Sequence, residues 1–161
     1  EAVSIIKEKF PKIMLLVVGD GPMKDELQNY AKALGLNEHV IFTGSRRDIP
    51  ALLAAMDIFV LPSLWEGLPN ALLEAMASGK PIIATDIPPV REAINFEKEG
   101  ILVPARNSSA IASSIEFLLV NKTFAVIFGN NAQKRAYSDF NITTTVDKYT
   151  NLYEDILSNK V

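Results

Sequence analysis

Residues 61–81, LPSLWEGLPNALLEAMASGKP, contain two glutamates eight positions apart, Glu66 and Glu74. Glu66 lies among Gly and Pro residues that predict a turn, whereas Glu74 lies in the opening turns of a helix predicted over 69–79. Apolar runs stand on both sides of this segment, and each is short enough to be a buried strand. The stretch therefore predicts a strand, a loop, a helix and a second strand, with the strands over 57–62 and 80–86.

The mouth of this helix combines groups that suit a polar ligand. Helical side chains lean toward the helix N-terminus, so Glu74 and the loop residue Glu66 face one small volume. Backbone N–H groups and the positive end of the helix dipole lie there too, and Gly67 lets a ligand approach the backbone. Carboxylates accept hydrogen bonds from sugar hydroxyls, and N–H groups suit a phosphate, so the combination predicts a nucleotide sugar. The plainer alternative is that Glu74 only stabilises its own helix.

Outside this stretch, predicted strands and helices alternate along the chain. The apolar run within 12–22 ends in Gly-Asp-Gly-Pro and predicts a strand buried on both faces, followed by a tight loop. Alternation of this kind predicts the α/β class: a Rossmann-like, doubly wound parallel sheet with helices on both faces. We expect one domain over 1–161, with the loops at the carboxyl ends of the strands gathered at one edge. The remaining strands are predicted over 39–44 and 100–104, and the remaining helices over 1–11, 23–36, 48–56, 108–120, 123–137 and 143–160.

The composition bounds the classes of function. A net charge of −3 argues against a nucleic-acid binder that acts by general attraction to phosphates. The chain has no cysteine for disulfides or thiolate metal sites, and it has no apolar run of about 18 residues that would predict a membrane span. No aspartate pair has the spacing of metal ligands, so no metal is expected. The first residues read as the middle of a helix without a cap, so we expect a fragment of a longer chain.

Several motifs follow one another in compact order between residues 12 and 119: VVGDGP, VIFTG, MDIFVLPS, EAMASGKPIIATD and GILVP. Together with the spacing of Glu66 and Glu74, this ordered set resembles the donor-binding signature of retaining glycosyltransferases with two Rossmann-like domains. The family is the large GT-B group known as family 4 or group 1. The resemblance implies that the chain is the C-terminal, donor-binding domain of such an enzyme.

The resemblance assigns roles to individual residues. It implies that Glu74 contacts the ribose hydroxyls of the donor. It implies that Glu66 contacts hydroxyls of the transferred sugar and acts catalytically by stabilising charge near the anomeric carbon. Gly19 and Gly21 would keep the first loop low beside the ligand. The implied donor site is completed by backbone amides around the helix start and by two residues near the nucleobase: Gly67, Leu68, Asn70, Ala71, Ser45 and Arg46.

The same resemblance implies the reaction and its partners. The donor is a nucleoside diphosphate sugar, and its hexosyl group passes to a glycan or lipid-linked acceptor with retention of configuration, without a metal or other cofactor. The acceptor site and an Arg–Lys pair that holds the diphosphate would lie upstream of Glu1, so this chain alone is expected to be inactive. The implied setting is polysaccharide biosynthesis in the cytoplasm, with the full-length protein peripheral to the inner face of the membrane.

The sequence departs from the family pattern after the fourth predicted strand. Pro88 and Pro89 stand where two glycines are common, and they stiffen the loop, so Glu92 is left outside the binding set. Two other functions stay open: a nucleotide-sugar epimerase of the same architecture, whose His and carboxylate pattern is not seen, and a non-catalytic nucleotide- or sugar-binding module. An Arg–Lys pair and a second Rossmann-like domain upstream would distinguish the enzyme from the module.

Some residues also have purely structural readings. Trp65, the one tryptophan, either lines the donor pocket or packs against the sheet. Asp48 is expected to cap a helix, and Gly129 is expected to weaken one. The apolar side chains of the last helix either pack on this domain or remain exposed toward the N-terminal domain and allow self-association. They are Val146, Tyr149, Leu152, Tyr153 and Ile156.

Overall fold

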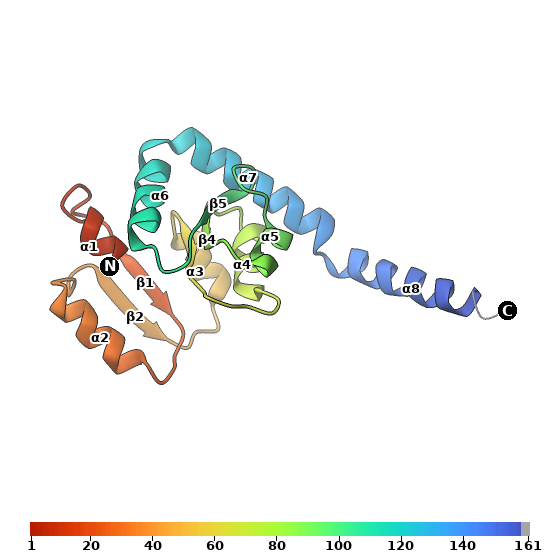
Figure 1. The fold of residues 1–161 in the computed structure, drawn as a ribbon, viewed down its shortest axis with the longest axis horizontal. Helices are drawn as coiled ribbons and strands as arrows, with labels where there is room; N and C mark the ends of the chain where they lie inside the picture. Colours follow the sequence, from red (N-terminus) through yellow and green to blue (C-terminus); the bar gives the residue numbers. More distant parts are fainter. Residues whose placement is uncertain (159–161) are drawn as a thin grey trace.

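The computed structural model describes residues 1–158 and arranges them as alternating helices and short strands (Figure 1). The elements follow the predicted order, with one added helix, α5, and the predicted extension of the last helix to residue 160 lies partly outside the described residues. The strands are β1 (Leu15–Val18), β2 (Val40–Gly44), β3 (Phe59–Leu61), β4 (Ile82–Thr85) and β5 (Gly100–Val103). The helices are α1 (Ala2–Ile6), α2 (Lys24–Ala33), α3 (Ile49–Ala55), α4 (Asn70–Ala77), α5 (Pro88–Ala93), α6 (Ser108–Val120), α7 (Lys122–Asp139) and α8 (Ile142–Ser158).

The strands pair in parallel throughout these ladders, which confirms the predicted α/β class. Hydrogen bonding divides them into two sheets, β1–β2 and β3–β4–β5. The sequence predicts a single sheet, but no ladder joins β1 to β3 within residues 1–158. In the larger sheet Ile82 is paired with both Phe59 and Gly100, so β4 is the central strand.

The central strand β4 lies between two cores. Its side chains alternate between the faces of the sheet, as strand geometry requires. Ile82 and Ala84 pack with buried residues of α4, α5 and the second half of α7, whereas Ile83 packs with those of α1, α6 and the first half of α7. All of β4 is buried, so the predicted helices on both faces are confirmed for this sheet.

The first strand is less buried than its apolar run predicts. Leu15 is exposed, and the other β1 residues are half-buried, so the prediction of burial on both faces was wrong. The physical reason is that β1 has a ladder partner on one side only among the described residues, and the following helix α2 buries none of its residues. An apolar run fits a buried strand but does not reveal what covers it.

Helix α7 fixes the end of α4 through backbone contacts. At Gly129 the two segments lie so close that a Cβ atom there would be 2.2 Å from the carbonyl oxygen of Gly79. Gln133 Nε2 donates a hydrogen bond to the carbonyl oxygen of Ala77 at 2.9 Å. The prediction that Gly129 is a weak point was therefore wrong, because the missing side chain is what lets α7 contact the end of α4.

The short helix α5 is not predicted by the sequence, because Pro88 and Pro89 resemble a loop. Both prolines lie in its first turn, where a missing N–H group costs little. Val90 and Ala93 are buried beneath the helix and join the core that also contains Ile82. The prolines thus begin a packed helix at the carboxyl end of β4.

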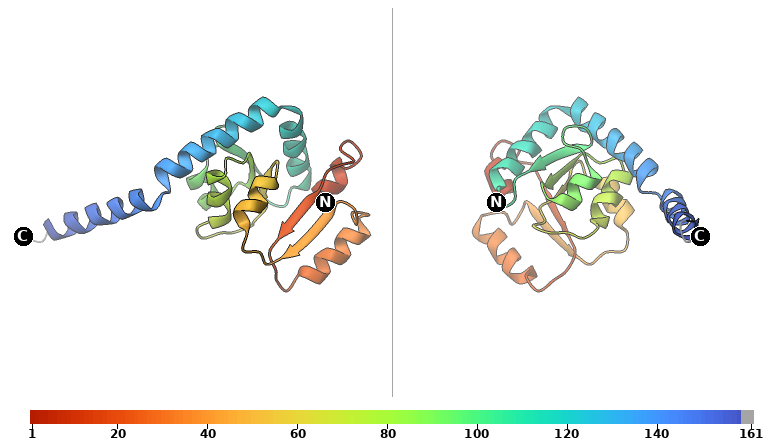
Figure 2. Two further views of the ribbon diagram at one scale, coloured as in Figure 1. Left: turned by 180° about the vertical axis from the view of Figure 1, so that it is seen from behind. Right: turned by 45° about the vertical axis from the view of Figure 1, so that its right-hand side comes forward.

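The last helix, α8, leads away from both sheets (Figure 2). No residue of its described length is buried, and its apolar side chains lie in solvent, including Leu152 and Tyr153. Of the two readings, exposure is confirmed and packing on this domain is wrong. No single helix within residues 1–158 is long and apolar enough to cross a membrane; Ser108–Val120 and Lys122–Ser158 meet that criterion only as a pair, bent by 103°.

Candidate functional site

The loop after β1 and the end of β2 are held together at the carboxyl edge of the smaller sheet. The Gly19 N–H donates to the carbonyl oxygen of Gly44 at 2.9 Å, and the two glycines form an isolated bridge. Both have positive φ, 131° and 67°, which favours glycine at these positions. Gly21 has open space around its Cα, so the backbone there is accessible to a ligand.

The mouth of α4 is open. Helix α4 begins at Asn70, and the residue before it, Pro69, is buried and offers no side-chain cap. The N–H groups of Gly67, Leu68 and Ala71 donate to no acceptor among the described residues. The Asn70 N–H is already bonded to the carbonyl oxygen of Leu68 at 2.9 Å, so of the four predicted amide contacts it is the one with a partner. An unsatisfied helix start of this kind attracts anionic and hydroxyl oxygens.

Neither glutamate side chain has a hydrogen-bond or ion-pair partner within residues 1–158, and that the two face one volume at the helix mouth stays a prediction. Glu66 is half-buried in the loop, and Glu74 is exposed on α4. Glu74 lies in the second turn, and the first turn of α4 contains no acidic residue. The helix dipole acts mainly within the first turn, so Glu74 in the second turn contributes little to the stability of α4 through the dipole. The two carboxylates are free to accept hydrogen bonds from hydroxyl groups.

The loop after β2 contains a bidentate ion pair. Arg46 Nε donates to Asp48 Oδ1 at 2.8 Å, and the second guanidinium bond to Asp48 Oδ2 is 2.6 Å long. These hydrogen bonds lower the pKa of Asp48 and raise that of Arg46. The prediction that Asp48 caps α3 was wrong, because its carboxylate bonds to Arg46 instead. Arg46 and Ser45 are exposed, so both are accessible beside the first loop.

A second ion pair closes the loop after β4 and was not predicted. Arg91 Nε donates to Asp86 Oδ1 at 2.5 Å, and this bond lowers the pKa of Asp86. The signal in the sequence is an Asp before the proline pair and an Arg after it. Glu92 is exposed, and its carbonyl oxygen accepts a hydrogen bond from Arg135 at 3.0 Å, which ties α5 to α7.

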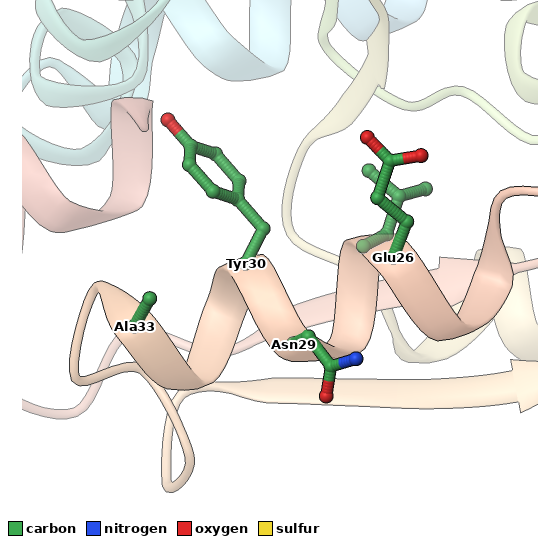
Figure 3. A pocket seen from close by; sticks show the side chains of 5 residues that line it. Glu26, Asn29, Tyr30 and Ala33 are labelled. Carbon is green, nitrogen blue, oxygen red and sulfur yellow. The ribbon is translucent and has the colours of Figure 1, made fainter.

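Two hollows in the surface lie away from the start of α4. One, of about 540 Å³, runs along α2 beside Leu27 and Tyr30 (Figure 3). Another, of about 650 Å³, lies beside Arg135 and Glu99. Neither contains a predicted site residue. Among residues 1–158 no cluster of three His, Cys, Asp or Glu side chains could hold a metal ion.

A family model described as "Glycosyl transferases group 1" matches residues 1–135. The chain is 34% identical over 151 residues to the UDP-Gal:alpha-D-GlcNAc-diphosphoundecaprenol alpha-1,3-galactosyltransferase of Escherichia coli, covering 93% of this chain and 39% of that protein. Among solved structures it resembles HepE of Anabaena in complex with UDP, at 28% identity and a TM-score of 0.85 over 90% of this chain and 42% of HepE. HepE is also solved with UDP-glucose, with a TM-score of 0.84.

A third likeness is to the C-terminal domain of a glycosyl transferase group 1 family protein, LpcC, from Francisella tularensis. The identity is 30% and the TM-score 0.79, over 88% of this chain and 76% of that one. The chain spans about two-fifths of the galactosyltransferase and of HepE.

Proposed function

This chain belongs to the group 1 glycosyltransferases, and from that premise we propose that it binds a nucleoside diphosphate sugar at the mouth of α4. The observation that carries the proposal is the pair of unpartnered carboxylates, Glu66 and Glu74, which flank in the chain the unbonded N–H groups of the described helix start. A nucleotide sugar matches both kinds of group, because its hydroxyls donate to carboxylates and its phosphates accept from N–H groups.

Each residue has a proposed role in holding the donor. Glu74 accepts hydrogen bonds from the ribose, and Glu66 accepts them from the sugar that is transferred. The N–H groups of Gly67, Leu68 and Ala71 contact the sugar and the diphosphate, with Asn70 beside them. The backbone at Gly19 and Gly21 makes room on one side of the ligand, and Ser45 and Arg46 lie where the base would rest.

The proposed reaction is hexosyl transfer with retention of the anomeric configuration. Positive charge develops on the sugar ring and negative charge on the departing diphosphate, so fixed charges and dipoles supply the stabilisation. Glu66 would stabilise the positive charge on the sugar ring, and the N-terminus of α4 would stabilise the negative charge on the diphosphate. We propose no metal or other cofactor in this step.

The acceptor, a glycan or a lipid-linked glycan, is proposed to bind to regions outside this sequence, together with cationic groups for the diphosphate. This follows from the share of its relatives that the chain spans, about two-fifths of the galactosyltransferase. Catalysis would then take place in a cleft of which the mouth of α4 is one wall. The epimerase alternative is not favoured, because the relatives described above are named as glycosyltransferases.

Ligand-observed NMR tests donor binding, with UDP-glucose, GDP-glucose and ADP-glucose titrated in parallel. We expect one nucleotide to bind with a dissociation constant on the order of 1 mM, equivalent to about 4 kcal/mol. Glu74→Ala should weaken that binding about tenfold, because a carboxylate–hydroxyl hydrogen bond is charge-assisted. The matched control is Glu154→Ala, which removes an exposed glutamate from α8. An affinity that Glu74→Ala leaves unchanged would contradict the proposal, and so would the absence of binding by all three nucleotide sugars.

A further inference from the structure

Trp65 leaves more of its surface in water than any other large apolar residue that the structure describes. Its relative exposure is 84%, and its neighbours Leu64 and Leu68 are also exposed, at 47% and 65%. The reading that Trp65 packs against the sheet is therefore wrong. An indole normally buries a large apolar area, so one held in solvent on a functional loop indicates a contact with something that binds there.

The position of Trp65 narrows what that contact is. It directly precedes Glu66 in the loop between β3 and α4, and Cα atoms of consecutive residues are about 3.8 Å apart. A ring that Glu66 holds by a hydroxyl group would therefore lie beside the same short loop that carries the indole. The loop is bounded by Pro62 and the buried Pro69, which limit its conformations.

The surroundings of the indole suit a sugar better than an apolar protein surface. In the loop the indole is followed directly by the carboxylate of Glu66 and by the open N–H groups of Gly67 and Leu68. A pyranose has an apolar C–H face and an edge of hydroxyl groups, and it needs both kinds of partner. Tryptophan supplies a broad, rigid contact with little loss of side-chain freedom.

We propose that Trp65 is the stacking platform for the sugar ring of the donor, with the C–H face of the ring on the indole and a hydroxyl on Glu66. This inference rests on the proposed function and adds a residue that distinguishes the sugar from the nucleotide. Trp65 would contribute to binding of the nucleotide sugar and contribute nothing to binding of the free nucleotide.

The sole tryptophan of the chain makes this directly measurable by intrinsic fluorescence. The probes are UDP and UDP-glucose, or the corresponding pair for whichever base the NMR panel identifies. UDP-glucose should shift the emission to shorter wavelength and lower the acrylamide quenching constant about twofold, because the ring covers an exposed indole. UDP should leave both unchanged.

The variants Trp65→Ala and Trp65→Phe test how much the indole contributes to binding affinity. Trp65→Ala should weaken the binding of UDP-glucose about fivefold, while the affinity for UDP should change by less than about twofold. Trp65→Phe should recover part of the lost affinity for UDP-glucose. Tyr153→Ala, which removes an exposed aromatic ring from α8, is the matched control and should change neither affinity.

The outcomes separate this inference from the proposed function. If UDP binds and depends on Glu74, but UDP-glucose neither alters the emission nor responds to Trp65→Ala, the stacking proposal is wrong and the donor-binding proposal stands. If no nucleotide binds at all, both fail. If Trp65→Ala lowers the affinities for UDP and UDP-glucose equally, the proposal is also overturned, because the substitution would then have a general effect on the loop.

Discussion

The two sheets differ in how well they are packed. In the larger sheet β4 is completely buried, with cores on both faces formed by α4, α5, α6 and α7. In the smaller sheet no residue of β1 is buried, and α2 beside it buries none of its ten residues. The proposed site draws on both: Glu66 and Glu74 belong to the packed half, whereas Gly19 and Gly21 belong to the open half.

This difference shows which element of the proposed site is held by a packed core. The end of α4 is fixed by α7, and Lys80 Nζ adds hydrogen bonds to the carbonyl oxygens of Ala54 and Met56 at 3.1 and 2.8 Å. Helix α4, which carries Glu74, is therefore held by the most buried part of the molecule. The first loop is positioned mainly by the Gly19–Gly44 hydrogen bond. Substitutions in the two halves should accordingly have very different effects.

The largest effect is expected from Gly129→Val in the packed half. A Cβ atom at this position would lie 2.2 Å from the Gly79 carbonyl oxygen, and backbone on both sides prevents an easy shift. The free energy of unfolding should fall by roughly 4 kcal/mol or the chain should fail to fold. Urea denaturation measures this. Gly21→Ala is the control, with nothing within 4 Å of the new Cβ, and a comparable loss there would refute the packing argument.

A core substitution compares the two sheets directly. Ile83 on β4 is completely buried, whereas Ile41 on β2 is 50% exposed. Ile83→Ala should cost about 2–5 kcal/mol of unfolding free energy, and Ile41→Ala should cost about 1 kcal/mol or less. Both values come from the same denaturation measurement. Equal losses would mean that the smaller sheet is as well covered as the larger one.

Amide hydrogen exchange tests the same contrast without mutation. Ladder amides of β4 should exchange only when the whole packed half opens, while those of β1 exchange through local opening. We expect protection at Ile83 to exceed that at Val17 by roughly tenfold or more. Similar protection at both residues would show that the two sheets open as one unit.

The smallest effect on stability is expected from the ion pair of Arg46 and Asp48 in the loop after β2. Arg46 lowers the pKa of Asp48, so the folded state favours the ionised carboxylate and gains stability at neutral pH. That gain is lost as the pH falls through the lowered pKa, below the usual carboxyl range of about 4. The stability difference between the wild type and Asp48→Asn should therefore be small at pH 7 and vanish in acid. A difference that persists or grows in acid would exclude this pair as its source.

Much of this architecture could be predicted because local patterns determine it. The apolar run of β4 and the 69–79 helix pattern are confirmed, since each reflects burial that its own residues dictate. The division between β1 and β3 could not be predicted, because a strand's sequence does not say whether its edge is paired. Likewise, Gly129 looks like a helix weakness until the contact with Gly79, fifty positions away, is known.

For the site, the position of Glu74 in the second turn of α4 was predicted, because the helix pattern and Pro69 mark where the helix begins. That its side chain and that of Glu66 face one volume stays a prediction. The role of Asp48 could not be foreseen, because capping and pairing with Arg46 compete for the same carboxylate. The exposure of Trp65 was equally open, since a loop sequence does not determine whether an indole turns inward or outward. The roles of the individual donor contacts remain predictions.

The measurement that tests the central claim most directly is a ¹H–¹⁵N correlation spectrum of the labelled chain during titration with UDP-glucose. We predict that the shifted amides cluster at the carboxyl edge of the strands, at Gly67, Leu68 and Ala71, with Gly19 and Ser45 beside them. Shifts confined to the hollow along α2, at Leu27 and Tyr30, would contradict this account, because they would place the ligand away from both glutamates.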